Sequence, residues 1–395
     1  MTKTIKDPIY SFIQIDELSQ QIIDTPEFQR LRYIKQLSVC HFVYPSATHT
    51  RFSHSIGVYN LAGKLMHILK NNQPELHITD RLILLVKIAG LCHDIGHVTF
   101  SHAFDERIIP YLKIHIPHHE IRSIQLFKYI IKKYNISITS DEIWFITSLI
   151  NPSPVGPEAD QGQGSTCLAL GVGLYWPPYL YEIISNSVNS IDVDKIDYLL
   201  RDSYHINIPC GFDYKYVLNN AKVIDNHISF HEKVAYTIYS LFNFRYRMHR
   251  EVYQHITTLK IEHMMADVIL KANHVICLEE YFKEDSVEWI KLTDTLLYKI
   301  ENYENQEEVK ESLELLNRIY TRNLYKIVPH TKKNGDFIKV CRHLGFTNKD
   351  TNPIDNVKFY DNNDPNHSYS LSKNDISHVL PRKTFEKEII YIKRC

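Results

Sequence analysis

The residues with the clearest chemical potential lie in one short run, residues 93–97, which reads His-Asp-Ile-Gly-His. A neighbouring imidazole and carboxylate can both bind one divalent ion. His97 follows His93 by four residues, so on a helix it would point into the same cavity. Because the chain has 22 histidines, about one His-Asp pair is expected by chance, and the surrounding residues must decide.

Two further segments carry side chains that could complete such a site. Arg51 and His54 stand at the start of a predicted helix, where a guanidinium and free backbone amides suit phosphate oxygens. Residues 191–202 divide into an apolar face and a polar face that holds Asp194, Lys195, Tyr198 and Asp202. Taken alone, this second segment is better explained as the solvated face of an amphipathic helix.

A third polar stripe occurs further along the chain. Arg245, His249 and Tyr253 follow one another at intervals of four residues on one predicted helix. Such a stripe could bind the outer phosphates and the sugar or base edge of a nucleotide. A polar helix face in solvent explains the spacing equally well.

Helical periodicity predicts the elements that must position these groups. It marks residues 53–70, residues 80–97 with Asp80 as N-cap, and residues 236–272 with one break. Glycine and proline predict a long loop at 151–178, and residues 337–340 and 357–360 are strand-like. We therefore predict a mainly α protein with a helical core over residues 1–272. A smaller α+β lobe over residues 273–395 is predicted to regulate the enzyme or to mediate its oligomerisation.

Composition excludes several classes of protein. The formal net charge of −1 argues against a surface that is wholly a nucleic-acid footprint. The most apolar stretch, residues 82–92, is too short for a membrane span and contains Lys87. Seven scattered cysteines without a C-x-x-C pair indicate reduced thiols. The protein is predicted to be intracellular, cytoplasmic or nuclear, without a membrane partner.

The order His54, His93-Asp94, Asp194 is the metal pattern of the HD superfamily. The segments around it are similar to the vertebrate-type SAM- and HD-domain-containing deoxynucleoside triphosphate triphosphohydrolases over nearly the whole chain. They are DTPEFQRLRYIKQL (24–37), THTRFSHSIGVYNLAGKL (48–65), IAGLCHDIGHVTFSHAFD (88–105), SNSVNSIDVDKIDYLLRD (185–202) and RNLYK (322–326). The resemblance implies an HD-domain helical core, and because the chain begins at that core, the SAM domain is expected to be lacking.

The resemblance also implies which residues catalyse the reaction. His54, His93, Asp94 and Asp194 would hold iron, manganese or magnesium, as one ion or two, and Mg²⁺ would accompany the nucleotide. The catalytic residues would be His102, Asp105 and His119. Asp105 follows His102 by three residues, so we expect it to orient that imidazole as a general acid. Without the resemblance, His119 would be taken for a surface histidine.

The same resemblance implies the substrate contacts. The positions that match those of the family are Gln36, Leu37, Arg51, His97, Lys195, Tyr198, Asp202, Arg245, His249 and Tyr253. The Tyr198 ring would pack under the deoxyribose and leave no room for a 2′-hydroxyl.

Regulation by nucleotides is the least uniform part of the match. Family members bind GTP and deoxynucleotide activators between subunits, and the matching positions are Lys3, Asp24, Gln29, Arg32, Arg322 and Lys326. Other sensing positions carry neutral or acidic residues here, namely Tyr216, His231, Thr237, Glu251 and Ile256. We therefore expect a homo-oligomer, a dimer or tetramer, whose nucleotide activation is altered or partly lost.

The predicted function is metal-dependent hydrolysis of deoxynucleoside triphosphates (dNTPs) to deoxynucleoside and inorganic triphosphate, which would control dNTP pools. One alternative is an HD phosphohydrolase that acts on another nucleotide. A second is a non-catalytic HD protein that binds single-stranded nucleic acid or a protein partner. Complete metal-ligand positions together with His102 and Asp105 argue against this second alternative.

Overall fold

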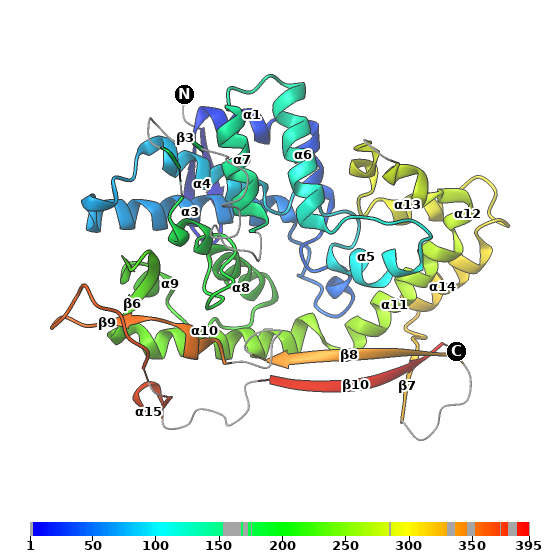
Figure 1. The fold of residues 1–395 in the computed structure, drawn as a ribbon. Helices are drawn as coiled ribbons and strands as arrows, with labels where there is room; N and C mark the ends of the chain where they lie inside the picture. Colours follow the sequence, from blue (N-terminus) through cyan, green and yellow to red (C-terminus); the bar gives the residue numbers. More distant parts are fainter. Residues whose placement is uncertain are drawn as a thin grey trace.

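The computed structural model describes residues 3–152, 167–168, 173–174, 176–283, 286–329, 336–345, 352–371, 373–377 and 385–394. Helices account for most of these residues and the strands form small sheets, which confirms the predicted mainly α fold (Figure 1). Within the described residues, no helix is both long enough and apolar enough to cross a membrane.

The N-terminal half begins with a hairpin and continues as helices. Strands β1 (Lys3–Asp7) and β2 (Ser11–Ile15) pair antiparallel. The helices that follow are α1 (Glu17–Ile23), α2 (Pro26–Gln29), α3 (Arg51–Asn72), α4 (Asp80–Cys92), α5 (His102–Arg107), α6 (His119–Lys133) and α7 (Ser140–Ile150). The predicted loop at 151–178 lies largely outside the described residues. Its described part includes the short paired strands β3 (Cys167–Leu168) and β4 (Gly173–Leu174).

The middle of the chain supplies a second set of elements. They are α8 (Val193–Ile206), α9 (Tyr214–Leu218), β5 (Ala221–Ile224), β6 (His227–His231), α10 (Ala235–Met248), α11 (Ile256–Lys271), α12 (Asn273–Ile276), α13 (Leu296–Glu301) and α14 (Lys310–Tyr320). Short 3₁₀ turns cover Arg30–Tyr33, Cys40–Phe42, Pro74–Leu76, Ile109–Tyr111, Pro178–Glu182, Glu232–Val234, Leu278–Phe282, Glu288–Lys291 and Pro353–Asn356.

Helix α3 packs against both α4 and α8, which places the three segments with predicted metal ligands side by side. Gly57 allows the close approach to α8, because a Cβ atom there would lie 1.8 Å from the Asp197 Oδ1 atom. Two details of α4 differ from prediction. Its N-cap is Thr79, whose side chain accepts from the Leu82 amide, and Asp80 is the first helical residue. The helix also ends at Cys92, so residues 93–97 follow the helix in a turn and are not part of it.

The predicted break in residues 236–272 lies between α10 and α11. His249–Tyr253 form a single π-helical turn there, a feature that is frequent at functional sites. Arg245, His249 and Tyr253 therefore do not lie on one regular α-helix, as the spacing had suggested.

The C-terminal residues form strands that return to the core. Strands β7 (Lys326–Val328), β10 (Phe385–Lys393) and β8 (Phe337–Gly345) form one antiparallel sheet, and β8 runs below α10 and α11 (Figure 1). Residues 337–340 lie in β8, as predicted. Within residues 357–360, only β9 (Phe359–Tyr360) is a strand, and it pairs with β6. The short helix α15 covers Lys373–Ile376. The domain boundary at residue 272 stays a prediction.

Candidate active site and metal centre

Four predicted metal ligands converge from three segments. His54 comes from α3, His93 and Asp94 follow α4, and Asp194 lies in the first turn of α8. The Nε2 atom of His54 lies 3.0 Å from an Asp194 carboxylate oxygen and 3.7 Å from Asp94. The Nε2 atom of His93 lies 3.3 Å from Asp194 and 3.6 Å from Asp94. Three of the four, His54, His93 and Asp94, offer ligand atoms that all lie within 4.8 Å of one another.

These donor atoms fit a divalent metal ion. The buried Nε2 atoms of His54 and His93 have no hydrogen-bond partner within the described residues, although carboxylates lie close to them. Donor atoms about 3 to 4 Å apart are what one ion with bonds of about 2.1 Å requires. Mixed imidazole and carboxylate ligands suit Fe, Mn or Mg better than a closed thiolate zinc site.

Electrostatics at the centre also favour a cation. Burial disfavours charge on His54, but Asp194 and Asp197 outweigh it and raise the pKa of His54 to about 10. Burial likewise disfavours charge on Asp194, yet His54 and His93 hold the pKa of that carboxyl far below its ordinary value. The carboxylates that stabilise a proton here would equally stabilise a metal ion, which displaces protons from its ligands.

Asp197 is a functional residue that sequence reasoning missed. Its Oδ2 atom accepts a hydrogen bond from His54 Nδ1 at 2.8 Å, and its Oδ1 atom accepts one from the Tyr10 hydroxyl, also at 2.8 Å. Arg201 donates to both oxygens of this buried carboxylate. Such a partner fixes the ring and leaves Nε2 free as a ligand. The spacing offered a signal, because Asp197 follows Asp194 by three residues on the same helix.

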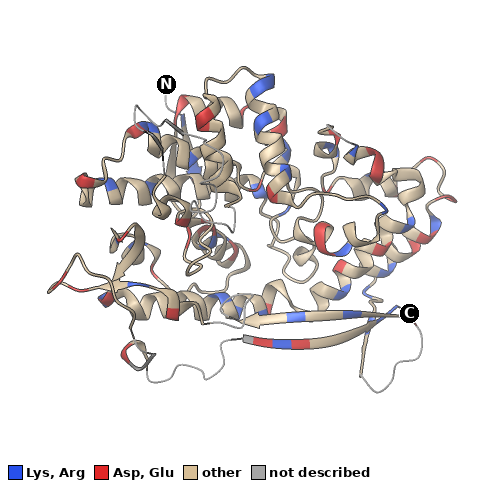
Figure 2. Cartoon of the chain, viewed as in Figure 1, with Lys and Arg blue, Asp and Glu red and all other residues tan. Residues whose placement is uncertain are grey.

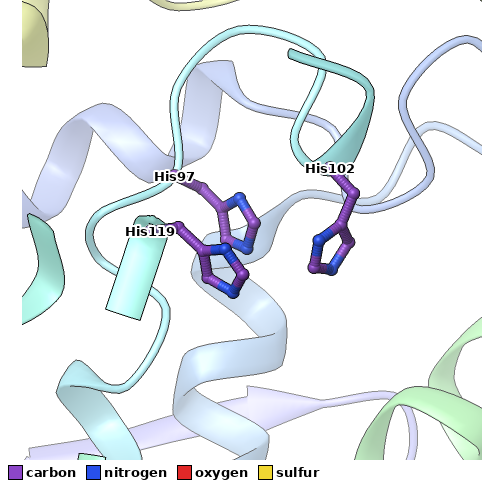
Figure 3. A group of neighbouring side chains, drawn as sticks. All are labelled: His97, His102 and His119. Atoms are coloured by element: carbon purple, nitrogen blue, oxygen red, sulfur yellow. The ribbon is translucent and has the colours of Figure 1, made fainter. Parts of the chain in front are cut away.

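A second cluster contains His97, His102 and His119, whose ring nitrogens lie within 4.8 Å of one another. Figure 3 shows the three rings together, carried by the turn after α4 and by the starts of α5 and α6. The His97 and His119 rings stack at 4.0 Å. We expected His97 to share a helix face with His93, but α4 ends at Cys92, so His97 joins this second cluster instead.

The turn that carries His97 is held from two sides. Gly96 packs against α6, where a Cβ atom would lie 2.2 Å from the His119 carbonyl oxygen. The buried Arg122 guanidinium donates to the Gly96 carbonyl, and Arg30 donates to the carbonyls on either side of that glycine. These arginines were not predicted as site residues, and their sequence context gave no signal.

The expected pairing of Asp105 with His102 is wrong. Asp105 accepts instead from His119 Nδ1 at 3.2 Å and from Arg122 at 2.7 Å. The reason is that α6 brings His119 and Arg122 against the side of α5 that carries Asp105. His119 is thus a half-buried partner of Asp105, with a side chain 15% exposed, and not a surface histidine.

Two imidazoles of the second cluster, His97 and His102, favour the neutral form. Burial, followed by the positive charge of Arg51, holds the pKa of His97 well below its ordinary value. Crowding by protein atoms and the Arg51 charge lower the pKa of His102 to about 3, although this ring opens onto the cavity. Arg51 itself contacts Asp94 and donates to Ser101, so its charge lies between the two clusters.

One cavity of about 570 Å³ is lined by His102 of the second cluster and by Arg51, which contacts Asp94 of the metal cluster, and it collects most of the predicted substrate contacts. Those that line it are Gln36, Leu37, Arg51, Tyr198, Asp202, Arg245, His249 and Tyr253, together with His102. Arg245 donates to the Tyr198 hydroxyl at 3.3 Å. His97 lies behind this lining, and Lys195 donates to Asp192 at 2.6 Å. Tyr198 and Asp202, on the polar side of α8, therefore face a cavity rather than bulk solvent.

The outer wall of the cavity contains residues that were not predicted. They come from α5 and α11, where Arg107 and Glu262 lie 3.8 Å apart, and from β8, which supplies Val340, Cys341 and His343. Gln254, next to the predicted Tyr253, also lines the cavity. The strand pattern of β8 could be predicted, but not its position across the cavity.

The predicted nucleotide-sensing residues lie away from this cavity. Lys3 and Asp24 are exposed and 3.9 Å apart. Arg32 donates to Gln29, and Arg322 donates to the Phe42 carbonyl at 2.8 Å. Lys326 is exposed in β7.

Comparisons with known proteins agree with this geometry. The HD domain family matches residues 51–202, the segment that carries all four metal ligands. Deoxynucleoside triphosphate triphosphohydrolase SAMHD1 of Xenopus laevis is 36% identical over 99% of this chain and 71% of that protein. The chain belongs to the SAMHD1 family. A SAMHD1 homolog of Dictyostelium discoideum is also 36% identical, over 98% of this chain and 76% of that protein. A putative HD domain-containing protein of Acanthamoeba polyphaga mimivirus is 30% identical over 96% of this chain. The predicted resemblance to the SAMHD1 family is confirmed.

Proposed function

We propose that this enzyme hydrolyses deoxynucleoside triphosphates to deoxynucleoside and inorganic triphosphate, and so controls dNTP pools. Water attacks the α-phosphorus, the bond to the 5′-oxygen breaks, and that oxygen takes a proton. The observation that carries the proposal is the convergence of His54, His93, Asp94 and Asp194 beside a cavity lined by Arg51 and Arg245. Membership of the SAMHD1 family supports the same reaction.

A metal ion bound to the four ligands would polarise the α-phosphate and lower the pKa of a bound water. We expect iron, manganese or magnesium in this place, with Mg²⁺ also accompanying the nucleotide. The same four ligands would hold one ion or two, as the family resemblance implies.

The proton for the 5′-oxygen is assigned to His102, because this member of the second cluster lines the cavity. Crowding by protein atoms, followed by the positive charge of Arg51, lowers the pKa of the His102 ring to about 3. A bound triphosphate brings negative charge beside the ring, which favours the protonated form. His119 and Asp105 would support this step from behind, since Asp105 holds His119 Nδ1.

Selection of deoxyribonucleotides is assigned to the part of the cavity lined by Tyr198, Tyr253 and Arg245. The Tyr198 and Tyr253 rings meet edge to face at 6.0 Å, and Arg245 fixes the Tyr198 hydroxyl. A ring held in this way would exclude a 2′-hydroxyl by steric conflict. Arg51 and Arg245 would bind phosphate oxygens.

Regulation is proposed on weaker similarity. GTP or dNTP activators would bind near Lys3, Asp24, Gln29, Arg32, Arg322 and Lys326 at contacts of a homo-oligomer, a dimer or tetramer. Two sensing positions that differ from the family are already engaged within the chain. Glu251 pairs with Arg247 at 3.1 Å, and His231 is buried and contacts Asn362 at 3.0 Å. These contacts support altered nucleotide activation.

Binding of single-stranded nucleic acid has less support. Figure 2 shows Lys and Arg interspersed with Asp and Glu over the molecule, in keeping with a net charge of −1. An extended basic surface would be needed to bind a polymer.

The test is release of tripolyphosphate from each dNTP in the presence of Mn²⁺ or Mg²⁺, measured by anion exchange. The double variant His93→Ala and Asp94→Ala should release none. A variant with Asp225→Ala, in an exposed turn between β5 and β6, should match the wild type. Release of pyrophosphate or phosphate instead of tripolyphosphate would contradict the proposed reaction.

A further inference from the structure

We infer that His49, which is outside the predicted substrate contacts, is a positioning residue of the substrate cavity. It lies just before α3, is 6% exposed, and is not among the described residues that line the cavity. The inference rests on the proposed function only for the identity of the substrate, a dNTP. Its basis is that His49 bonds to Asp202 through its ring and to Gln36 through its carbonyl oxygen, and that both residues line the cavity.

The side chain of His49 fixes Asp202. Asp202 Oδ1 accepts a hydrogen bond from His49 Nε2 at 2.7 Å, and Asp202 Oδ2 accepts one from the Tyr253 hydroxyl at 2.7 Å. The His49 and Asp202 side chains are 2% and 1% exposed, so water does not compete for this bond. Rotation of the carboxylate would break both bonds. His49 therefore sets the orientation of Asp202 and, through it, of Tyr253.

The ring of His49 is itself held by α8. The His205 ring stacks on it, with centroids 4.3 Å apart and planes 10° apart. Asp202 and His205 are three residues apart on α8, so this helix contacts the edge of the His49 ring through Asp202 and its face through His205. The remaining nitrogen, Nδ1, is buried and has no hydrogen-bond partner within the described residues. Within the described residues, Asp202 is therefore the hydrogen-bond partner of the His49 ring.

The backbone at residues 49–51 joins two further parts of the wall. The His49 carbonyl oxygen accepts from the Gln36 amide at 3.0 Å, and the Arg51 amide donates to the Ile34 carbonyl at 3.0 Å. Between these bonds, Lys35 and Thr50 form an antiparallel bridge. Gln36 and Arg51 both line the cavity. His49 consequently connects the loop at residue 36, the start of α3 and the middle of α8.

A positioning role and a packing role predict different kinetics. Loss of packing would reduce the fraction of folded enzyme, which lowers the apparent kcat and leaves KM unchanged. Misplacement of Asp202 and Tyr253 would weaken contacts that are made in ground state and transition state alike, which raises KM. The distinction requires variants that keep size and polarity but move the donor.

His49→Gln and His49→Asn form such a pair. The glutamine amide nitrogen can take the place of Nε2 and donate to Asp202, whereas the asparagine amide stops near the position of Nδ1. With dATP and Mn²⁺, His49→Asn should raise KM about tenfold, and His49→Gln should stay within about threefold of the wild type. A further variant, His205→Ala, removes only the stacked ring and should change KM less than His49→Asn does.

Coupling to Tyr253 completes the test. If His49 acts through Asp202, combining His49→Asn with Tyr253→Phe should raise KM by less than the product of the two single effects. Equal KM values for the two His49 variants, or a fall in kcat at constant KM, would overturn the inference.

A failure of the proposed function can be separated from a failure of this inference. The affinity for dATP is also measured by equilibrium dialysis in an Asp194→Ala background, where turnover does not interfere. If the wild type does not hydrolyse dATP, the proposed function fails. The ratio of dATP affinities between His49→Gln and His49→Asn in that background still decides the role of His49.

Discussion

The metal centre and the outer wall of the cavity differ in how their side chains are fixed. At the metal centre, α3, α4 and α8 pack directly, and Asp197 orients His54 through a buried hydrogen bond. The outer wall combines α5 and α11 with β8, whose cavity residue Cys341 is exposed. The comparison indicates that direct packing of helices fixes the metal centre, whereas the outer wall depends on a strand that is distant in the sequence.

The largest effect is expected from Asp194, which faces both metal-binding histidines. Asp194→Ala removes an anionic ligand, and triphosphate release should fall by about a thousandfold or more because electrostatic stabilisation of the reaction is lost. Activity is measured at saturating Mn²⁺, after dialysis against EDTA to remove other ions. Lys195→Ala, at the next position, serves as control and should cost less. Comparable losses in the two variants would contradict the special role assigned to Asp194.

Gly57 tests whether close packing is necessary at the metal centre. Gly57→Ala would place a Cβ atom 1.8 Å from Asp197 Oδ1, so α3 and α8 must separate. We expect unfolding to become easier by about 2 to 3 kcal/mol, with a lower affinity for Mn²⁺. Urea denaturation checks the stability. Gly63→Ala is the matched control, because the atom it would meet is the flexible Lys87 side chain at 3.0 Å. Equal stabilities of the two variants would show that packing at Gly57 is not constrained.

A change at Asp105 tests whether its carboxylate supports the second cluster through His119. Asp105→Asn keeps the shape but weakens the bonds to His119 and Arg122. Loss of such a supporting carboxylate typically costs about ten- to a hundredfold in activity, and we expect the effect mainly in kcat. Glu106→Gln, at the adjacent exposed position, should have a smaller effect. A change in KM alone would place Asp105 in substrate binding instead.

Much of the metal centre could be predicted from the sequence, whereas the support around it could not. The HD-superfamily order of ligand types predicted His54, His93, Asp94 and Asp194. Helical periodicity predicted α3 and one break within residues 236–272, but not the position of that break. The pairing of Asp105 was predicted wrongly because a helical i, i+3 rule considers one helix, and its partner arrives on α6. The role of β8 depends on contacts between residues about 90 positions apart, as between Gln254 and the His343 carbonyl. Local patterns contain no information about such contacts.

Glu262 tests the outer wall through the pH dependence of the protein's stability. Burial raises the pKa of this carboxyl to about 7, against the opposing charge of Arg107. Between the ordinary value near 4.5 and about 7, the folded state therefore binds more protons than the unfolded state. Stability should fall as pH rises through this window, by about 3 kcal/mol in total. Glu262→Gln should remove this dependence and stabilise the protein at pH 8. Thermal denaturation at pH 5 and pH 8 measures both effects, and parallel curves for the two proteins would contradict the assignment.

The smallest effect on the fold is expected at the sensing positions. The Arg322 side chain is exposed, and its guanidinium donates a hydrogen bond to the Phe42 carbonyl. Arg322→Ala should leave the melting temperature unchanged, because exposed side chains contribute little to stability. If Arg322 senses a nucleotide, the same change should weaken GTP binding by about tenfold or more, since a charge-assisted contact to phosphate is lost. Fluorescence anisotropy of a labelled GTP measures this, with Lys310→Ala as an exposed control. Unchanged GTP affinity in Arg322→Ala, or no GTP binding by the wild type, would remove Arg322 from the sensing site. Regulation in this chain would then have diverged further from the SAMHD1 family than its metal centre has.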